Sequence, residues 1–252
     1  MYAAIPKDVL CVSARKDGRI IATGLGILDR DLEAAQALAE RLTAEGGRAE
    51  AFRCDLSEAE SIDRAVTEAH RAFGKIDVLA ENCGVGGYMD WTVMTEDQWH
   101  SFTDVNVTGA FLCIQRVAQE MIRDGIRGKI ILTLSQASYT QDETIVTPYC
   151  TSKWAERGLM RVAAAALSPY GITVNGVCPG TVWSPMMEGF FEEYAAATGS
   201  SKEEYIRFIE SKYPTGRIQT GEDIAAMYAF LAGHSTHMTG QSVLVAGGIA
   251  FA

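Results

Sequence analysis

The sequence predicts an α/β fold: a doubly wound parallel sheet with helices on both faces, forming three layers in a single domain. Short apolar runs alternate with stretches of helical periodicity along the whole chain, which is typical of such sheets. The 252 residues suit one domain, and no linker, repeat or low-complexity tract divides them. The composition, 48% hydrophobic and 21% charged, is globular and excludes a disordered or fibrous chain.

Each expected element has a local reason. Helices are expected where apolar residues share one face behind a capping residue, as Ser57 with Glu60 and Thr95 would provide. Strands are expected at short buried runs such as residues 76–80 (IDVLA) and 129–134 (KIILTL). In chain order, the expected elements are helix 31–45, strand 48–54, helix 57–73, strand 76–80, helix 96–123, strand 129–134, helix 149–167, strand 172–178, helix 223–232 and strand 242–245.

Residues 183–213 interrupt this alternation and are rich in aromatic residues and methionine. Two interpretations are compatible with each other. The segment is a helical pair packed on the domain or on a partner subunit, or it is an apolar lid over a substrate pocket.

The first 28 residues admit three arrangements. In the first, residues 9–12 form a strand, 13–18 a short phosphate turn and 19–26 a shortened helix. In the second, residues 8–14 and 19–23 form a hairpin around Asp17-Gly18, a strong turn signal. In the third, residues 19–23 are the opening strand. We favour the first because it keeps the sheet whole, although the β-branched residues of 19–26 disfavour a helix.

Composition also limits the partners. The formal net charge is −10 and no basic run opposes it, so nucleic-acid binding is not expected. No apolar run reaches the length of a membrane span or a secretory signal, which favours a cytoplasmic protein without membrane contact and with reduced thiols at its six scattered cysteines. His234 and His237 have no third ligand nearby, so no metal site is expected.

Tyr149 and Lys153 carry the most informative local pattern. Four positions apart on a helix, they face the same way, and an ammonium near a phenol favours the phenolate. We therefore expect Lys153 to lower the pKa of Tyr149 toward neutrality and make it a proton donor and acceptor.

Other polar residues fall where open α/β sheets place their sites, at the carboxyl ends of strands. Ser135 follows strand 129–134, Asn82 follows strand 76–80, and Pro179-Gly180 ends strand 172–178. Asn106 lies inside helix 96–123, where an asparagine is a candidate for an unusual backbone or water contact.

Together these motifs resemble the short-chain dehydrogenase/reductase family from about residue 27 to the C-terminus. The sequences of these motifs are most similar to those of acetoin/diacetyl reductases and polyol dehydrogenases. The resemblance implies a Rossmann-like domain, here with an irregular first βαβ unit, and a homotetramer. The matching segments are CDLSE (54–58), ENCGV (81–85), DVNVTGAF (104–111), TLSQAS (133–138), YCTSK (149–153), NGVCPGTVWSPM (175–186) and MTGQSVLVAGG (238–248).

The resemblance implies a nicotinamide-dependent oxidoreductase. Tyr149 would exchange a proton with the substrate oxygen, which Ser135 would polarise. Lys153 would hold the nicotinamide ribose, and Asn106 would hold a water of the proton relay. The implied cofactor contacts are Asp29, Asp55, Leu56, Asn82, Gly84, Tyr149, Lys153, Pro179, Gly180, Val182 and Ser184, and the expected substrate contacts are Gln136, Trp183 and Met187.

The opening departs from the family. Its glycine-rich turn, which lets the backbone approach a pyrophosphate, is reduced to Thr23-Gly24-Leu25-Gly26. Arg15 or Lys16 could supply a compensating charge. Asp29 stands where the family binds the adenosine ribose, so we expect NAD rather than NADP. Glu81 replaces the first asparagine of the family's N-N-A-G.

Two functions follow. The favoured one is hydride transfer between a nicotinamide cofactor and a small secondary alcohol or ketone: a hydroxyketone, diol or polyol. The alternative is a scaffold that has lost dinucleotide binding and acts as a cofactor-independent acid/base enzyme or a non-catalytic binding subunit.

Overall fold

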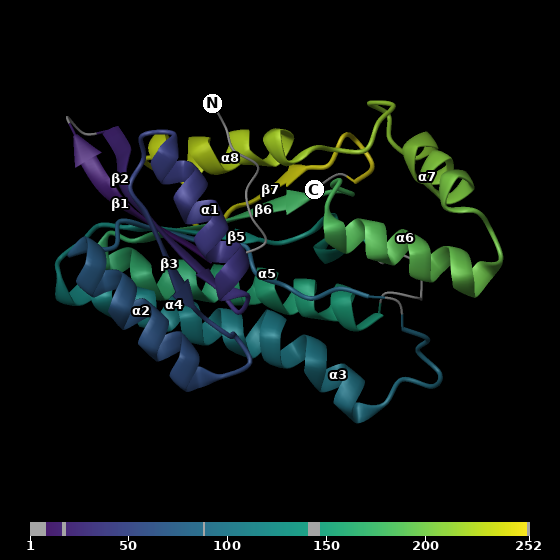
Figure 1. Ribbon diagram of the computed structural model, residues 1–252, viewed down its shortest axis with the longest axis horizontal. Coiled ribbons are helices and arrows are strands. Elements are labelled where there is room, and N and C mark those ends of the chain that lie inside the picture. Colours follow the sequence, from purple (N-terminus) through teal and green to yellow (C-terminus); the bar gives the residue numbers. More distant parts are fainter. Residues whose placement is uncertain (1–8, 17–18, 88, 141–146, 251–252) are drawn as a thin grey trace.

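The computed structural model describes residues 9–16, 19–87, 89–140 and 147–250. Its strands form one sheet in the order β3-β2-β1-β4-β5-β6-β7 (Figure 1). The strands are β1 Val9–Lys16, β2 Arg19–Asp29, β3 Ala49–Arg53, β4 Val78–Glu81, β5 Lys129–Thr133, β6 Thr173–Pro179 and β7 Ser242–Val245. The α-helices are α1 Leu32–Ala44, α2 Ala59–Phe73, α3 Glu96–Thr103, α4 Ala110–Arg123, α5 Thr147–Leu167, α6 Pro185–Thr198, α7 Lys202–Ser211 and α8 Gly221–Gly233.

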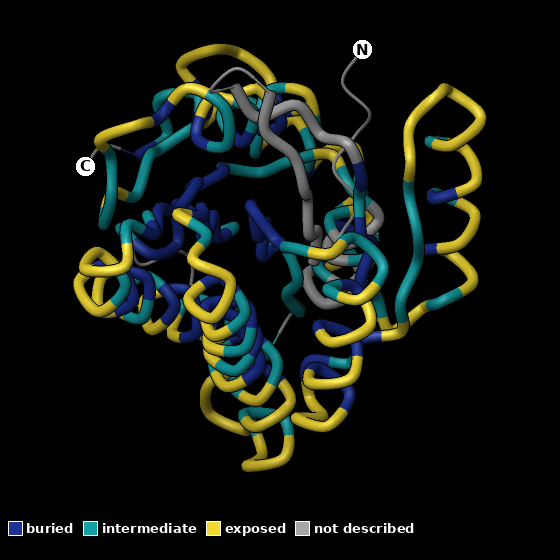
Figure 2. The backbone as a smooth tube through the Cα atoms, turned by 90° about the vertical axis from the view of Figure 1, so that its left-hand side faces the viewer, coloured by how far each residue is buried: buried dark blue, intermediate teal, exposed yellow. Residues whose placement is uncertain are grey.

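The helices cover both faces of the sheet. α1 and α8 pack on one face, while α2, α4 and α5 pack on the other (Figure 1). The side chains of β4 alternate accordingly, because successive residues of a strand point to opposite faces. Leu79 belongs to the core beneath α4 and α5, whereas Val78 and Ala80 pack with residues of α8. Figure 2 shows the resulting buried centre and the exposed outer faces of the helices.

The predicted fold class is confirmed, and the expected elements from residue 31 onward are found with small shifts of their ends. The expected capping box of Ser57 and Glu60 is wrong. Glu58 is the N-cap of α2, and the Ser57 hydroxyl donates to Asp55 Oδ1 at 2.7 Å instead. Serine competes for nearby acceptors in this way when a carboxylate stands two residues before it. No described helix is long and apolar enough to cross a membrane.

The favoured arrangement of the opening residues is also wrong. β1 and β2 form an antiparallel hairpin, with Val9 opposite Leu28 and Lys16 opposite Arg19, so residues 19–26 are strand and not helix. The structure follows the second arrangement, although Asp17 and Gly18 lie outside the described residues. Isoleucine and threonine are stiff at χ1 and fit a pleated strand better than a helix, and their preference prevails here.

The hairpin reverses the direction of β1. It runs antiparallel to β4 as well as to β2, whereas β2 with β3 and β4 through β7 pair in parallel. Val12 lies opposite Val78, the first residue of β4, so the backbone of Lys16 lies beyond the amino end of that strand. Arg15 and Lys16 are therefore placed at the edge of the sheet opposite the carboxyl ends, and the expectation that they serve a phosphate there is wrong.

Gly24 lies within β2 and packs against α2. A Cβ on Gly24 would lie 2.4 Å from the Phe73 ring, so this glycine makes room for that partly buried side chain at the end of α2. In this structure Thr23-Gly24-Leu25-Gly26 is a strand segment, not a phosphate turn.

Candidate active site at the carboxyl edge of the sheet

Three parallel strands bring the predicted residues to one edge. β4, β5 and β6 end at Glu81, Thr133 and Pro179, and the first turns of α5 lie beside these ends. Parallel strands place their carboxyl ends together, which is why motifs far apart in sequence meet here.

Ser135, Tyr149 and Lys153 lie together. The hydroxyls of Ser135 and Tyr149 are hydrogen-bonded, and Lys153 Nζ lies 5.7 Å from the centre of the Tyr149 ring. Ser135 is held by its own loop, because its Oγ also accepts a hydrogen bond from the Ala137 amide at 3.1 Å. A substrate oxygen placed at these two hydroxyls would meet a polariser and a proton donor together.

Asn106 occupies a six-residue π-helical turn, Asp104–Gly109, between α3 and α4. Its Oδ1 accepts from the Val85 amide at 2.8 Å, and its Nδ2 donates to the Val85 carbonyl at 2.9 Å and to Ser152 Oγ at 2.8 Å. The expected unusual backbone contact is therefore present. Asn106 ties the loop after β4 to α5, and π-turns inside helices are frequent at functional sites.

Lys153 has two close partners that the sequence analysis missed. Its Nζ donates to the Thr133 carbonyl at 2.9 Å and to Glu156 Oε2 at 2.8 Å. Glu156 is fully buried, and so is Glu81 at the end of β4. The i,i+3 spacing of Lys153 and Glu156 was a signal for their contact. It gave no sign that both would be buried, since most such pairs lie on surfaces.

The expected lowering of the Tyr149 pKa is not found in the protein without ligands. Burial of the phenol raises the Tyr149 pKa, although Lys153 and the hydrogen bond from Ser135 oppose that effect. The Glu156 charge adds to the increase because it offsets the neighbouring ammonium. The spacing of Tyr149 and Lys153 in the sequence shows the ammonium near the phenol, but it shows neither the burial of the phenol nor the charge of Glu156.

The loop after β6 begins at the same edge of the sheet. The Gly180 amide donates to Gln219 Oε1 at 2.7 Å, and a Cβ on Gly180 would lie 2.5 Å from the Tyr213 hydroxyl. Val182 forms a parallel bridge with Gln219, through hydrogen bonds of the flanking residues. Ser184 is the N-cap of α6, where its Oγ accepts from the Met187 amide.

Acidic residues stand at the ends of β2 and β3, farther along this edge of the sheet. Asp29 ends β2, and its Oδ1 accepts from the Asp31 amide at 2.8 Å. Asp55 follows β3, and its hydrogen bonds from Ser57 lower its pKa and favour the carboxylate. Leu56 beside it is buried in the core.

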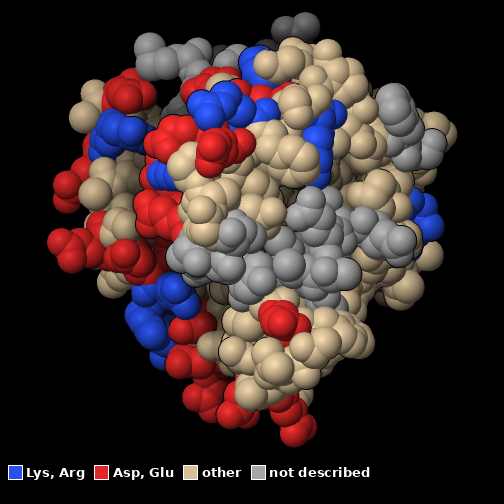
Figure 3. Space-filling model, turned by 90° about the vertical axis from the view of Figure 1, so that its right-hand side faces the viewer, with Lys and Arg blue, Asp and Glu red and all other residues tan. Residues whose placement is uncertain are grey.

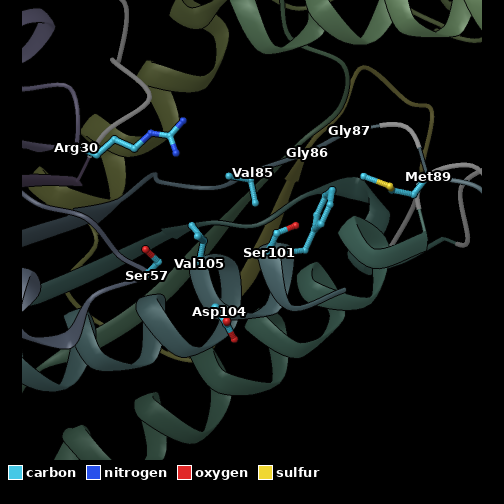
Figure 4. Close-up of a pocket in the computed structure, with 10 residues that line it drawn as sticks. Arg30, Ser57, Val85, Gly86, Gly87, Met89, Ser101, Asp104 and Val105 are labelled. Atoms are coloured by element: carbon cyan, nitrogen blue, oxygen red, sulfur yellow. The ribbon is translucent and has the colours of Figure 1, made fainter. Parts of the chain in front are cut away.

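Residues after β4 complete this end. Asn82 Oδ1 accepts a hydrogen bond from Thr133 Oγ1. Gly84 runs so close to the polar cluster that a Cβ on it would lie 3.4 Å from Lys153 Nζ and 3.5 Å from Asn106 Oδ1. A cavity of about 620 Å³ opens next to it (Figure 4). Its lining includes Arg30, Ser57, Val85, Gly86, Asp104 and Val105. Arg30 at this position was not anticipated.

The fit to a dinucleotide differs along its length. The loop after β6 and the Tyr149–Lys153 pair suit the nicotinamide end, and the cavity beside Asp29 and Arg30 suits the adenosine end. For the pyrophosphate between them, the described residues of the β1–β2 hairpin offer no glycine turn at a helix N-terminus. No cluster of three potential metal-ligating side chains is found in the described parts of the chain.

The expected substrate residues surround this edge from two sides. Gln136 is buried in the short 3₁₀ turn that follows Ser135. Ser138, two residues on, is turned inward and donates to the Ser135 carbonyl at 2.6 Å. From the other side, α6 and α7 form the predicted helical pair. Trp183 packs edge-on to Phe191 at 5.7 Å, and Met187 packs on the same cluster.

Comparisons with known proteins agree with this architecture. The family model adh_short_C2, described as enoyl-(acyl carrier protein) reductase, matches residues 21–250. The short-chain reductase protein NovJ of Streptomyces niveus is 33% identical over 240 residues, 94% of this chain and 89% of that protein. The diacetyl reductase [(S)-acetoin forming] of Staphylococcus aureus is 34% identical over 198 residues, 78% of this chain and 76% of that one.

Solved structures are similar over the same region. Sorbitol-6-phosphate 2-dehydrogenase SrlD of Erwinia amylovora has a TM-score of 0.85 at 29% identity, covering 90% of both chains. A single-residue variant of the actinorhodin polyketide ketoreductase, whose structure was determined with NADPH, has a TM-score of 0.84 at 28% identity, covering 89% of this chain and 86% of that one.

Proposed function

Since the chain belongs to the short-chain dehydrogenase/reductase family, as an oxidoreductase, we propose that it interconverts a small secondary alcohol and the corresponding ketone, with hydroxyketones, diols or polyols as substrates. The observation that carries this proposal is the convergence of Ser135, Tyr149, Lys153 and Asn106 at one sheet edge. A bound nicotinamide would supply or accept the hydride.

The protein's own residues then handle orientation and the proton. The Ser135 hydroxyl orients the substrate oxygen, and Tyr149 Oη gives a proton to that oxygen during reduction or takes it during oxidation. Lys153 favours the phenolate electrostatically and stands where it can hold the nicotinamide ribose. Asn106 fixes the loop after β4 against α5, so that Lys153 keeps its place.

The surface that carries α6 and α7 supports a substrate class. Its described part shows uncharged side chains over a broad area, while the acidic and basic side chains are densest toward the left of the view (Figure 3). We infer a small uncharged substrate contacted by Gln136, Trp183 and Met187. The printed names of the diacetyl reductase and of the L-2,3-butanediol dehydrogenase of Corynebacterium glutamicum agree with this class.

For the cofactor we propose NAD. Asp29 Oδ1 accepts a hydrogen bond from the Asp31 amide, and the carboxylate would also accept hydrogen bonds from the ribose hydroxyls. Asp55, Leu56, Asn82 and Gly84 would line the adenosine end. The loop from Pro179 and Gly180 to Val182 and Ser184 would meet the nicotinamide end.

We also propose a homo-oligomer, a tetramer, located in the cytoplasm. Large apolar side chains stand exposed on the outer surfaces of α4 and α5: Phe111, Trp154 and Val162. Helix faces of this kind are suited to association with a second copy. Sedimentation velocity of the protein and of Val162→Asp tests the assembly.

The first experiment is a calorimetric titration with NADH and, separately, NADPH. Micromolar binding of NADH supports the proposal, and a screen of diacetyl, acetoin and 2,3-butanediol follows. Absence of binding of either at millimolar concentration contradicts it.

One observation favours a second candidate. The β1–β2 hairpin replaces the unit that normally cradles a pyrophosphate. A protein that does not bind a dinucleotide would use Ser135 and Tyr149 for acid/base chemistry without hydride transfer, or would serve as a non-catalytic binding subunit. The same titration separates the two candidates.

A further inference from the structure

Two buried glutamates lie behind the proposed catalytic residues, and the mechanism above uses neither. Glu81 ends β4 on the same face of the sheet as Leu79, because side chains two apart in a strand share a face. That face is covered by α5, which carries Glu156. Both carboxyls are fully excluded from solvent. The Lys153 ammonium is paired with Glu156 Oε2 at 2.8 Å.

The hydrogen bonds distinguish the two carboxyls. Glu156 Oε2 accepts a hydrogen bond from the Lys153 ammonium, whereas Glu81 has no cationic donor among the described residues, and only the backbone N–H of Cys83 favours its carboxylate form. A buried carboxylate without a cationic partner is costly, so such a group takes up a proton. One ammonium cannot balance two buried carboxylates, and the geometry assigns its charge to Glu156.

We propose that Glu81 and Glu156 form a carboxyl pair that shares one proton, and that this pair sets how much of the Lys153 charge acts on Tyr149. The inference rests on the proposed function, because it concerns the proton exchanged by Tyr149. Glu81 and Glu156 are positioning residues here: they act through Lys153 and do not touch the substrate.

The electrostatics of the cluster agree with this assignment. Burial raises the pKa of Glu81 to about 8, with the Glu156 charge adding to the increase and with Lys153 and the Cys83 backbone N–H opposing it. Burial also raises the pKa of Glu156, but the charge of Lys153 and its hydrogen bond to Glu156 oppose that increase. Besides burial, the Glu156 charge raises the pKa of the Tyr149 phenol on α5, and the charges of both glutamates raise the pKa of the buried Tyr228 phenol on α8.

Nearby thiols do not change the charge balance of the Glu81–Glu156 pair. Cys178 on β6 is buried, and burial raises its pKa to about 11, so it remains neutral in the range where the pair titrates. Cys83 lies two residues after Glu81 and is half-buried, and it acts on Glu81 through its backbone N–H. Lys153 is thus the cation that acts on both carboxyls.

A functional consequence follows. With Glu81 protonated, Glu156 and Lys153 balance each other, and loss of the Glu81 proton leaves a net negative charge beside Tyr149. That charge opposes ionisation of the phenol. The pair therefore keeps Tyr149 in the hydroxyl form, the proton donor for carbonyl reduction, up to a higher pH than Lys153 alone would allow. It also moves the onset of alcohol oxidation to higher pH.

Infrared spectroscopy of the unliganded protein tests the pair without requiring turnover. A protonated buried carboxyl gives a C=O stretching band at pH 7 that disappears as the pH rises through about 8. Glu81→Gln should abolish this band. The control is Asp77→Asn, which removes a buried carboxyl paired with Lys75 at the other end of β4 and should leave the band in place. A wild-type protein without the band at pH 7 overturns the proposal, whatever its activity.

The pH profile of kcat/KM tests the effect on Tyr149. Glu156→Gln should shift the acid limb of alcohol oxidation to lower pH by about one unit, a tenfold gain at a pH on that limb. Glu81→Gln should shift it in the same direction, and Asp77→Asn should not shift it. Profiles of both glutamine variants that coincide with wild type overturn the proposal. If no substrate is turned over, ultraviolet titration of Tyr149, measured against the matching Tyr149→Phe proteins, must show the same shift or the proposal fails.

Discussion

The two halves of the sheet use the same edge differently. From β4 to β7 every strand is parallel, and the strand ends bring Ser135, the loop after Pro179 and the start of α5 together. From β1 to β2 the chain doubles back in a hairpin, so β1 presents its amino end to that edge. The second half brings the proposed catalytic residues together, whereas the described residues of the first half include no glycine turn at a helix N-terminus.

The difference teaches that the proton chemistry and the dinucleotide cradle are separable parts of this fold. Tyr149 and Lys153 depend on α5 and on β5, with which the hairpin forms no pairing. The proposed adenosine contacts at Asp29 and Asp55 depend on β2 and β3, which remain parallel to each other. Substitutions in each half by itself can therefore establish which half limits the activity of the protein.

Tyr149→Phe should have the largest effect. It removes the proton donor of the second half, so turnover should fall by about 10²–10⁴-fold, the usual contribution of general acid–base catalysis. Initial rates with diacetyl and NADH measure the change, and calorimetry should show that NADH still binds. The exposed Tyr170→Phe is the control and should retain full activity. Full residual activity in Tyr149→Phe would refute the assignment of Tyr149.

Glu81→Gln should have the next largest effect, on stability. The Glu81 pKa rises from its ordinary 4.5 to about 8 on folding. Between these values only the folded chain keeps the proton, so the free energy of unfolding of the wild type falls as the pH rises through this window. The neutral amide of the variant does not titrate, so the variant does not lose stability in this window. At pH 8 its free energy of unfolding should exceed that of the wild type by on the order of 2–4 kcal/mol.

Urea unfolding at pH 5 and pH 8 measures that difference. At pH 5 the two proteins should be nearly equal, because Glu81 is then protonated in the folded chain. Parallel stability curves for variant and wild type across the window would show that Glu81 is ionised in the folded protein.

Gly24→Ala sharpens the comparison from the side of the hairpin. A Cβ there would meet the Phe73 ring at 2.4 Å, and that ring is itself packed against Phe52 and Arg48. Overpacking of this kind costs about 1–3 kcal/mol, while the Kd for NADH should stay unchanged. Gly158→Ala, at an open position on α5, is the control and should not destabilise. A weakened Kd with unchanged stability would mean that Gly24 contacts the cofactor.

The sequence predicted the second half well because its signals are local. Thr95 caps its helix as predicted, in a capping box that Gln98 completes, and Ser135 follows a buried strand as predicted. The hairpin was harder to predict, since residues 19–26 carry strand-forming residues within a family pattern that expects a helix. Glu156 could not be recognised because its spacing from Lys153 is equally common on exposed helix faces. Only the packing of α5 on the sheet shows that both are buried.

Asp29→Ala should have the smallest effect, on cofactor choice. Asp29 ends β2, which pairs with β1 in the hairpin and with β3 in the parallel part of the sheet. The substitution therefore tests whether the proposed adenosine end binds the cofactor although the first two strands form a hairpin. Loss of a charged acceptor for the ribose hydroxyls should reduce the preference for NADH over NADPH by about tenfold, or about 1.4 kcal/mol.

A second residue, Arg30, affects the expected result of Asp29→Ala. Arg30 lines the cavity and follows Asp29 in the chain. Once the Asp29 carboxylate is removed, the Arg30 guanidinium would pair with the 2′-phosphate of NADPH. Asp29→Ala should therefore bind NADPH more tightly, and adding Arg30→Ala should reverse that gain. Glu33→Ala, an exposed carboxylate in the first turn of α1, should leave the ratio of the two Kd values unchanged. A ratio that Asp29→Ala does not alter would mean that β2 no longer contributes to cofactor recognition. The functional part of the edge would then begin at β3.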